Sequence, residues 1–173
     1  TYAAAIEAFI AFFPLFGIHL GLGDARSLSL LTIFALGGVF LQLPLGWLAD
    51  HVRRHTLLLS CIGLTLGGFA LMPVFIAKPV LGPVFAFSLG GFEGMISALG
   101  VILRGQYFRG AELAAASVLF TGMWGAGTMI GPLLVGAGMD VFGDSSRTSL
   151  IAGIYACYLP FYWYSRRIKP ARN

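Results

Sequence analysis

The side chain with the clearest potential for chemistry is Glu93, an acid inside a long apolar stretch. It lies fourteen residues after Pro79, in a stretch that ends near Leu103. A helix rising about 1.5 Å per residue would therefore carry it close to the middle of a bilayer. A carboxyl group at that depth is costly and by default functional. Removal from water favours its neutral form, so we expect proton uptake there. The alternative is a structural carboxyl that bonds a neighbouring helix.

Other polar and aromatic side chains in apolar stretches are candidates for contact with a substrate or a coupling ion. Glu7 lies in the first stretch and faces either the same cavity or the membrane interface. Gln42 is uncharged and able to bond a substrate or another helix. The remaining candidates share helix faces at spacings of three or four, and tyrosines near helix ends are alternatively interface anchors. These candidates are Trp124 with Thr128, and Tyr155 with Tyr158.

Patterns typical of enzymes and metal sites are absent from the sequence. It has no phosphate-binding glycine loop, no HExxH motif and no paired Cys-x2-Cys. Cys61 and Cys157 lie in separate apolar stretches, and the three histidines lie at the ends of such stretches. We therefore expect no catalytic residues, no cofactor and no bound metal.

The composition places the chain in a lipid environment. Hydrophobic side chains make up 58% of the sequence and charged ones only 10%, with a mean hydropathy of +0.87. A soluble domain carries roughly 25% charged residues, so too little charge is present to cover a surface in water. The eleven Lys and Arg residues occur in short clusters and form no stripe along a helix. That distribution argues against a nucleic-acid partner.

Six apolar stretches are long enough to cross a bilayer, because one helical crossing needs about 20 mostly apolar residues. They do not alternate apolar and polar residues, as the strands of a membrane barrel do. Helices also satisfy every backbone polar group in lipid. The sequence therefore predicts an all-α integral membrane protein with one six-helix transmembrane domain over residues 1–173. The expected spans are about 1–22, 27–49, 56–77, 80–103, 113–141 and 148–166.

The basic residues predict the orientation of these spans. Three of them, Arg26, Lys78 and Arg147, lie in loops on one side of the predicted membrane. The other eight follow the second, fourth and sixth spans. Since cytoplasmic loops carry the excess of Lys and Arg, both termini are expected in the cytoplasm.

A carboxylate and two arginines follow the second predicted span, in the run Gly46-Trp-Leu-Ala-Asp50-His-Val-Arg53-Arg54. Gly46 permits close approach of a neighbouring helix. At a membrane boundary, Asp50 beside two guanidinium groups can bond a neighbouring helix end in one conformation and release it in another. We interpret Gly46, Asp50, Arg53 and Arg54 as a candidate gating loop. The alternative is a cluster of charges that simply stops at the membrane surface.

A second run, Gly127-Thr-Met-Ile-Gly131-Pro132-Leu-Leu-Val-Gly136, lies in the fifth predicted span. Gly127 and Gly131 form a GxxxG face that permits tight helix packing in lipid. Pro132 removes a backbone donor and favours a bend. We expect a packing and kink element that suits rocking motions, with static packing as the alternative.

Both runs resemble motifs of the major facilitator superfamily. The Gly46-x-Leu-Ala-Asp50-x3-Arg54 run is similar to the family's signature loop, which joins the second and third helices of each six-helix half. The Gly127-x3-Gly131-Pro132 run resembles the fifth-helix motif and its counterpart in the eleventh. Six spans with both termini inside match one half, so the resemblance covers the whole chain.

Three features favour the C-terminal half, helices seven to twelve: a degenerate signature loop, the fourth span and the chain end. Arg53 stands where the signature loop has a glycine, and His51 stands where it has an arginine. The fourth span lacks an intramembrane arginine, and the chain ends in a basic tail, 166–173. The missing half, helices one to six, is then an expected partner.

The resemblance implies secondary transport of a small solute by alternating access, with protons as the candidate coupling ion. Residues 90–143 also resemble small bacterial facilitators, which implies the lipid bilayer of a bacterial inner membrane. The scaffold is shared by transporters of many solutes and implies no particular substrate. A function from another class is a six-helix membrane scaffold or assembly subunit that transports nothing.

Overall fold

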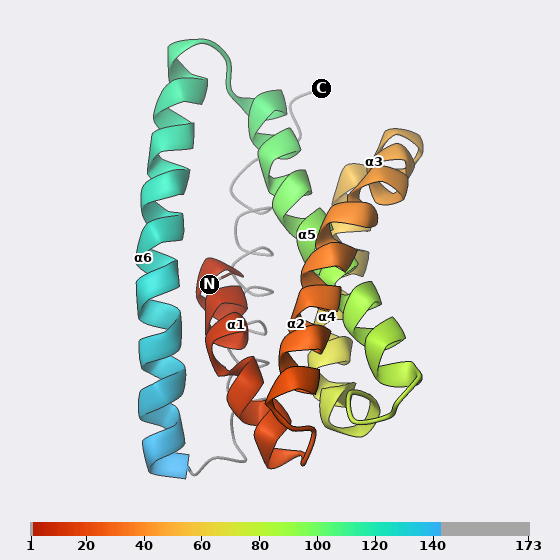
Figure 1. Cartoon of the computed structure of the whole chain (residues 1–173). Coiled ribbons are helices and arrows are strands. Elements are labelled where there is room, and N and C mark those ends of the chain that lie inside the picture. Colours follow the sequence, from red (N-terminus) through yellow and green to blue (C-terminus); the bar gives the residue numbers. More distant parts are fainter. Residues whose placement is uncertain (1, 143–173) are drawn as a thin grey trace. The chain divides into compact units, whose positions relative to one another are not determined.

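The computed structural model describes residues 2–142, which form helices joined by short connections and, within that range, no strands (Figure 1). By internal contacts the chain divides into two compact units, which are described separately. One contains Phe13–Met123, and the other joins the start of α1, as far as Phe12, to α6 from Trp124 onward. The helices are α1 (Tyr2–His19), α2 (Asp24–Phe40), α3 (Gln42–His51), α4 (Arg54–Phe75), α5 (Leu81–Tyr107) and α6 (Ala111–Phe142).

Most of these helices are long and apolar enough to cross a bilayer. Four segments of the described chain qualify, the first of which combines α2 and α3. Helix α1 is apolar over Ala3–Ile18 but shorter than those four. The all-α membrane class predicted from the sequence is therefore confirmed. The predicted span at 148–166 lies outside the described residues. The four segments are Asp24–His51, Arg54–Phe75, Leu81–Tyr107 and Ala111–Gly138.

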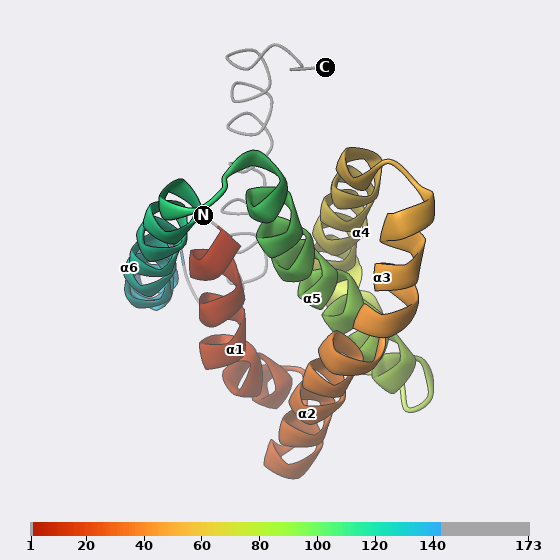
Figure 2. The same cartoon turned by 90° about the horizontal axis from the view of Figure 1, so that it is seen from above.

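A proline explains why α2 and α3 are separate helices. Pro44 has no N–H group, so it cannot donate to the carbonyl of Phe40, and its ring crowds that carbonyl. Helical hydrogen bonds continue on both sides, from Leu41 N to Gly37 O (3.0 Å) and from Leu45 N to Leu41 O (3.1 Å). The chain therefore changes direction at Leu41 while remaining close to helical (Figure 2).

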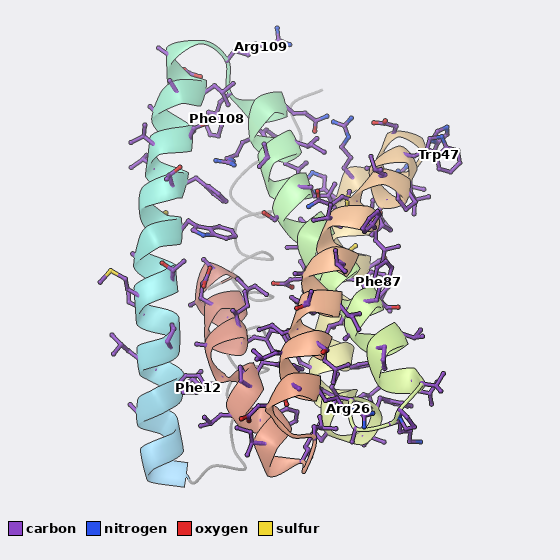
Figure 3. The ribbon with its side chains drawn as sticks, in the orientation of Figure 1. Phe12, Arg26, Trp47, Phe87, Phe108 and Arg109 are labelled. Atoms are coloured by element: carbon purple, nitrogen blue, oxygen red, sulfur yellow. The ribbon has the colours of Figure 1, made fainter. Side chains whose placement is uncertain are left out.

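Helices α2 and α5 are in backbone contact where they cross, because glycines line the crossing. A Cβ atom added to Gly94 would lie 2.6 Å from the carbonyl oxygen of Gly38. One added to Gly37 would overlap the carbonyl group of Phe87, which is labelled in Figure 3. Gly90 lies in the same way against the backbone of Phe34. Small residues permit this approach in lipid, where close packing holds helices together.

Helices α4 and α5 form an antiparallel pair with a well-defined register. At one end the Phe75 and Phe85 rings stack with centroids 5.6 Å apart. At the other end His55 Nε2 lies 3.2 Å from the hydroxyl oxygen of Tyr107. Between these ends, apolar side chains of both helices are buried, which makes this pair the core of its unit. They include Cys61, Ile62, Phe69 and Met72 of α4 and Leu89, Met95, Ile96 and Leu99 of α5.

Two arginines join helix ends in the unit formed by residues 13–123. Arg26, near the start of α2, donates from Nη2 to the carbonyl oxygen of Ala77, just after α4, at 3.1 Å (Figure 3). The guanidinium carbon of Arg104 lies 3.6 Å from the ring centroid of Phe120, across the connection between α5 and α6. A cation over an aromatic face is attractive, most of all where water is scarce. These contacts fix the two ends of the unit.

Replacing Gly37 with Ala is expected to destabilise the protein by about 1–3 kcal/mol, because the added methyl group would overlap a backbone carbonyl that cannot turn aside. The matched control is Gly63→Ala in α4, where a Cβ atom would meet no described atom within 4 Å. That change should be neutral or stabilising, since Ala favours a helix over Gly. Thermal unfolding in detergent, followed by circular dichroism, gives the comparison. Equal melting temperatures for the two variants would contradict the crossing.

Candidate functional site

Glu93 lies in α5 beside the glycine crossing, and its side chain is only 3% exposed. Among the described residues, the buried side chains that are polar or charged are Ser27, Thr65 and Glu93. Ser27 donates to the carbonyl oxygen of Gly23 at 2.8 Å, within its own helix end. Glu93 is thus the buried acid in the part of the chain that the structure describes. A carboxyl group in such surroundings strongly favours its neutral form unless a donor or cation faces it.

The structure brings a second candidate, Gln42, to the same place. Its side-chain nitrogen, Nε2, donates to the carbonyl oxygen of Gly94 at 3.3 Å, joining the start of α3 to the residue after Glu93. Gln42 is otherwise exposed. Of the two roles expected for it, a bond to another helix is the one observed here. A contact between Gln42 and a substrate stays a prediction.

The candidates in the other unit are described separately from Glu93. Glu7 is half-buried in α1. Trp124 and Thr128 are half-buried on one face of α6, and the Thr128 hydroxyl donates to the carbonyl oxygen of Gly125 at 2.7 Å. That hydroxyl can still accept a hydrogen bond from a ligand. The remaining two candidates, Tyr155 and Tyr158, lie outside the described residues.

The glycine motif of α6 packs against the first turns of α1. A Cβ atom at Gly127 would lie 2.9 Å from that of Ala3, and one at Gly131 would overlap the backbone of Ala4. Gly136 faces the Phe12 ring, at 3.6 Å from such a Cβ atom, and Figure 3 labels Phe12 between the two helices. Helix α6 stays helical through Pro132. In this structure the motif is therefore a helix-packing surface.

The candidate gating loop contains an exposed ion pair between the end of α3 and the start of α4. Arg54 Nη2 lies 3.4 Å from Asp50 Oδ1, and the two side chains are 30% and 70% exposed. Arg53 is exposed at the N-cap position of α4. No described atom lies within 4 Å of a Cβ atom built on Gly46, so no described helix packs closely there. Exposed pairs of this kind contribute little stability and break readily.

Three features of the site region were not predicted from the sequence. The glycine pair at 37–38 lies opposite Gly90 and Gly94, and pairs of small residues in two apolar stretches are the signal for such a crossing. Arg26 was treated as a loop charge, whereas it is half-buried and bonds Ala77. Thr65 is one of three hydroxyl residues in the apolar stretch 56–77, and nothing in its spacing distinguishes it from the other two. Among the described residues, no group of His, Cys, Asp or Glu side chains has a metal-binding arrangement.

The ion pair between Asp50 and Arg54 is expected to contribute less than about 1 kcal/mol to folding, because both groups are exposed. A double-mutant cycle with Asp50→Asn and Arg54→Gln measures that coupling from free energies of unfolding. The coupling should vanish near 1 M salt, where the screening length is about 3 Å. A coupling of several kcal/mol that persists in salt would show a structural bond instead.

Comparison with known proteins agrees with the fold. The family model for the Major Facilitator Superfamily matches residues 1–173. A curated relative, described as the uncharacterized MFS-type transporter YfkF of Bacillus subtilis (strain 168), is 28% identical over 130 residues. The match covers 75% of this chain and 33% of that protein, so the chain spans about a third of the length of this relative. No solved structure matches the chain significantly. With a family match over its full length and apolar spanning helices, this chain is a multi-pass membrane protein that belongs to the major facilitator superfamily of transporters.

Proposed function

We propose that this chain is the C-terminal six-helix half of a secondary transporter, with Glu93 as its proton-coupling residue. The transporter moves a small solute by alternating access across a bacterial inner membrane, with both chain termini in the cytoplasm. The observation that carries the proposal is the burial of Glu93 beside the crossing of α2 and α5. Family membership supports transport in general, and Glu93 supplies a specific means of coupling.

Burial makes the charge state of Glu93 depend on access to water. The neutral carboxyl is compatible with apolar surroundings, and the carboxylate is not unless donors or water reach it. In alternating access, a site near the middle of the membrane is opened to one side and then to the other. Glu93 can therefore bind a proton from one side and release it to the other.

The position of Glu93 relates its charge to helix packing. The next residue, Gly94, accepts the Gln42 hydrogen bond and faces the backbone of Gly38. A change in the hydration of Glu93 thus occurs next to Gly94, the residue at which α5 contacts α2. Because these helices pack through backbone atoms, a small shift at this place has no flexible side chain to absorb it.

Assignment to the C-terminal half rests on the signature loop. Arg53 and His51 depart from the family pattern of that loop. In such transporters the solute cavity lies between two six-helix halves. The described chain also exposes large apolar side chains, which lipid or a second half must cover in the membrane. On α2 and α3 they include Val39, Phe40 and Leu43, and on α6 Val118, Leu119 and Met123.

Replacing Glu93 with Gln is expected to abolish proton-driven uptake, because an amide neither binds nor releases the coupled proton. The measurement uses vesicles containing the complete transporter, with whichever of a panel of labelled sugars, amino acids and organic cations the wild type takes up. Glu112→Gln, the same change at an exposed acid in the first turn of α6, is the matched control and should retain uptake. Unchanged coupling with lowered thermal stability would favour a structural carboxyl, as expected of a scaffold.

The chain reconstituted alone in liposomes is expected to show no uptake, because it supplies one wall of the cavity. Adding the N-terminal half during reconstitution should restore transport to the level of the complete protein. Uptake of the same panel by both preparations provides the measurement. Full transport by the purified chain as a monomer would overturn its assignment as a half.

A further inference from the structure

Thr65 combines full burial with a side-chain hydroxyl that makes no hydrogen bond. Six other side-chain hydroxyls of the described helices donate to a carbonyl of their own helix or its cap, three or four residues earlier, which is the usual arrangement in membrane helices. Thr65, in α4, is fully buried at 0% exposure, and its Oγ1 makes no hydrogen bond. The hydroxyl is thus placed for a different acceptor. The six that donate within their helix are Ser27, Ser29, Thr32, Ser88, Thr121 and Thr128.

The register of α4 and α5 brings Thr65 level with Glu93. In an antiparallel pair, a step back along one helix matches a step forward along the other. A Cβ atom at Gly68 would overlap the side chain of Leu89, so Thr65, three residues earlier, is level with position 92. The stacked Phe75 and Phe85 rings form a second reference pair. Thr65 lies ten residues before Phe75, so by this pair it is level with position 95. Glu93 lies between these two positions.

The side chains of Thr65 and Glu93 also lie on the faces of α4 and α5 that contact each other. Thr65 is three residues from Gly68, and Glu93 is four residues from Leu89. Residues at these spacings share a helix face, and Gly68 and Leu89 are in contact. Two of the buried polar side chains among the described residues are therefore level with each other on the facing sides of one helix pair.

We propose that Thr65 is a positioning residue whose hydroxyl donates a hydrogen bond to the carboxylate of Glu93 after that carboxyl has released its proton. The inference rests on the proposed proton-coupling role of Glu93. The proton passes from the Glu93 carboxyl to water, and Thr65 keeps its own hydrogen throughout. In this structure the Thr65 hydroxyl makes no hydrogen bond, so its hydrogen is available to a carboxylate at Glu93.

This hydrogen bond makes release of the proton easier. A donor to a carboxylate favours the charged form, and hydrogen bonds to charged groups are stronger than those between neutral ones. Without it, the charged carboxyl would have one donor fewer in an apolar helix interface. Without the Thr65 donor, the Glu93 carboxyl would therefore retain its proton to a higher pH.

Other titratable groups in the described part of the chain lie toward the helix ends, except for Cys61. Cys61 is buried one turn before Thr65 on α4. Helices α2, α3 and α4 pack along α5, and α6 contacts it where Phe120 lies against Arg104. Within residues 13–123, the remaining titratable or charged side chains of these helices, with those of α5 itself, are Asp24, Arg26, Asp50, His51, Arg54, His55, Arg104, Tyr107 and Glu112. Thr65 is thus the buried hydroxyl of α4 that lies level with Glu93.

The test compares the pH dependence of proton-driven uptake by the complete transporter, together with infrared titration of its protonated carboxyl band. Thr65→Val keeps the side-chain shape and removes the donor, so both midpoints should rise by about one pH unit or more. Thr65→Ala, a smaller change that serves if the Val variant does not fold, should do the same. Thr65→Ser keeps the hydroxyl and should retain the wild-type midpoints. Thr32→Val, at an exposed hydroxyl that donates within α2, is the control and should cause no shift.

The outcomes separate this inference from the proposed function. If Glu93→Gln abolishes coupling while Thr65→Val and Thr65→Ala leave both midpoints unchanged, Glu93 retains its role and the role of Thr65 is wrong. A lower melting temperature without a shift in midpoint also overturns it, since packing alone would then explain the residue. If Glu93→Gln leaves coupling intact, the proposed function and this inference both fail.

Discussion

Direct contact between the backbones of α2 and α5 is the constraint on which the rest of the larger unit depends. Lipid gives apolar helices little reason to associate, so their attraction comes from close packing and from polar bonds. Gly37, Gly90 and Gly94 let two helices meet without intervening side chains. The same contact holds Glu93 in a buried position and brings Gln42 within reach of the Gly94 carbonyl. The packing of α4 along α5 then completes the core and supplies Thr65.

Much of the fold could be predicted from the scarcity of charge. Long uncharged stretches can satisfy their backbone in lipid only as helices, which is why the all-α class followed from composition and length. Helix ends were harder to predict. The fourth span was expected to end near Leu103, yet α5 continues to Tyr107 and includes Arg104, which donates to Gly100 and lies over the Phe120 ring. Hydropathy falls at the first charge, whereas backbone hydrogen bonds continue past it.

The candidate site was only partly predictable. The depth of a residue in the membrane can be inferred from its own helix, whereas its neighbours on other helices cannot. Counting residues along a single stretch placed Glu93 near the membrane middle, and the structure shows it buried. Its alignment with Thr65, twenty-eight residues earlier, depends on the register of two helices. Likewise the sequence contains several glycine pairs, but only the fold shows that 37–38 meets 90–94, while no described atom lies within 4 Å of a Cβ atom on Gly46. Such pairings require tertiary contacts that spacing does not encode.

The interruption at Leu41 has a mechanical consequence for the second membrane segment. Because Pro44 has already removed one hydrogen bond there, tilting α3 relative to α2 breaks few further bonds. The backbone contacts at Gly37 and Gly90 lie on or against α2, before the bend, so they need not separate when α3 tilts. Helix α3 can therefore tilt about this bend while α2 keeps its backbone contacts with α5. Gln42 is the first residue of α3 after the bend, so its hydrogen bond to the Gly94 carbonyl would lengthen early in such a tilt.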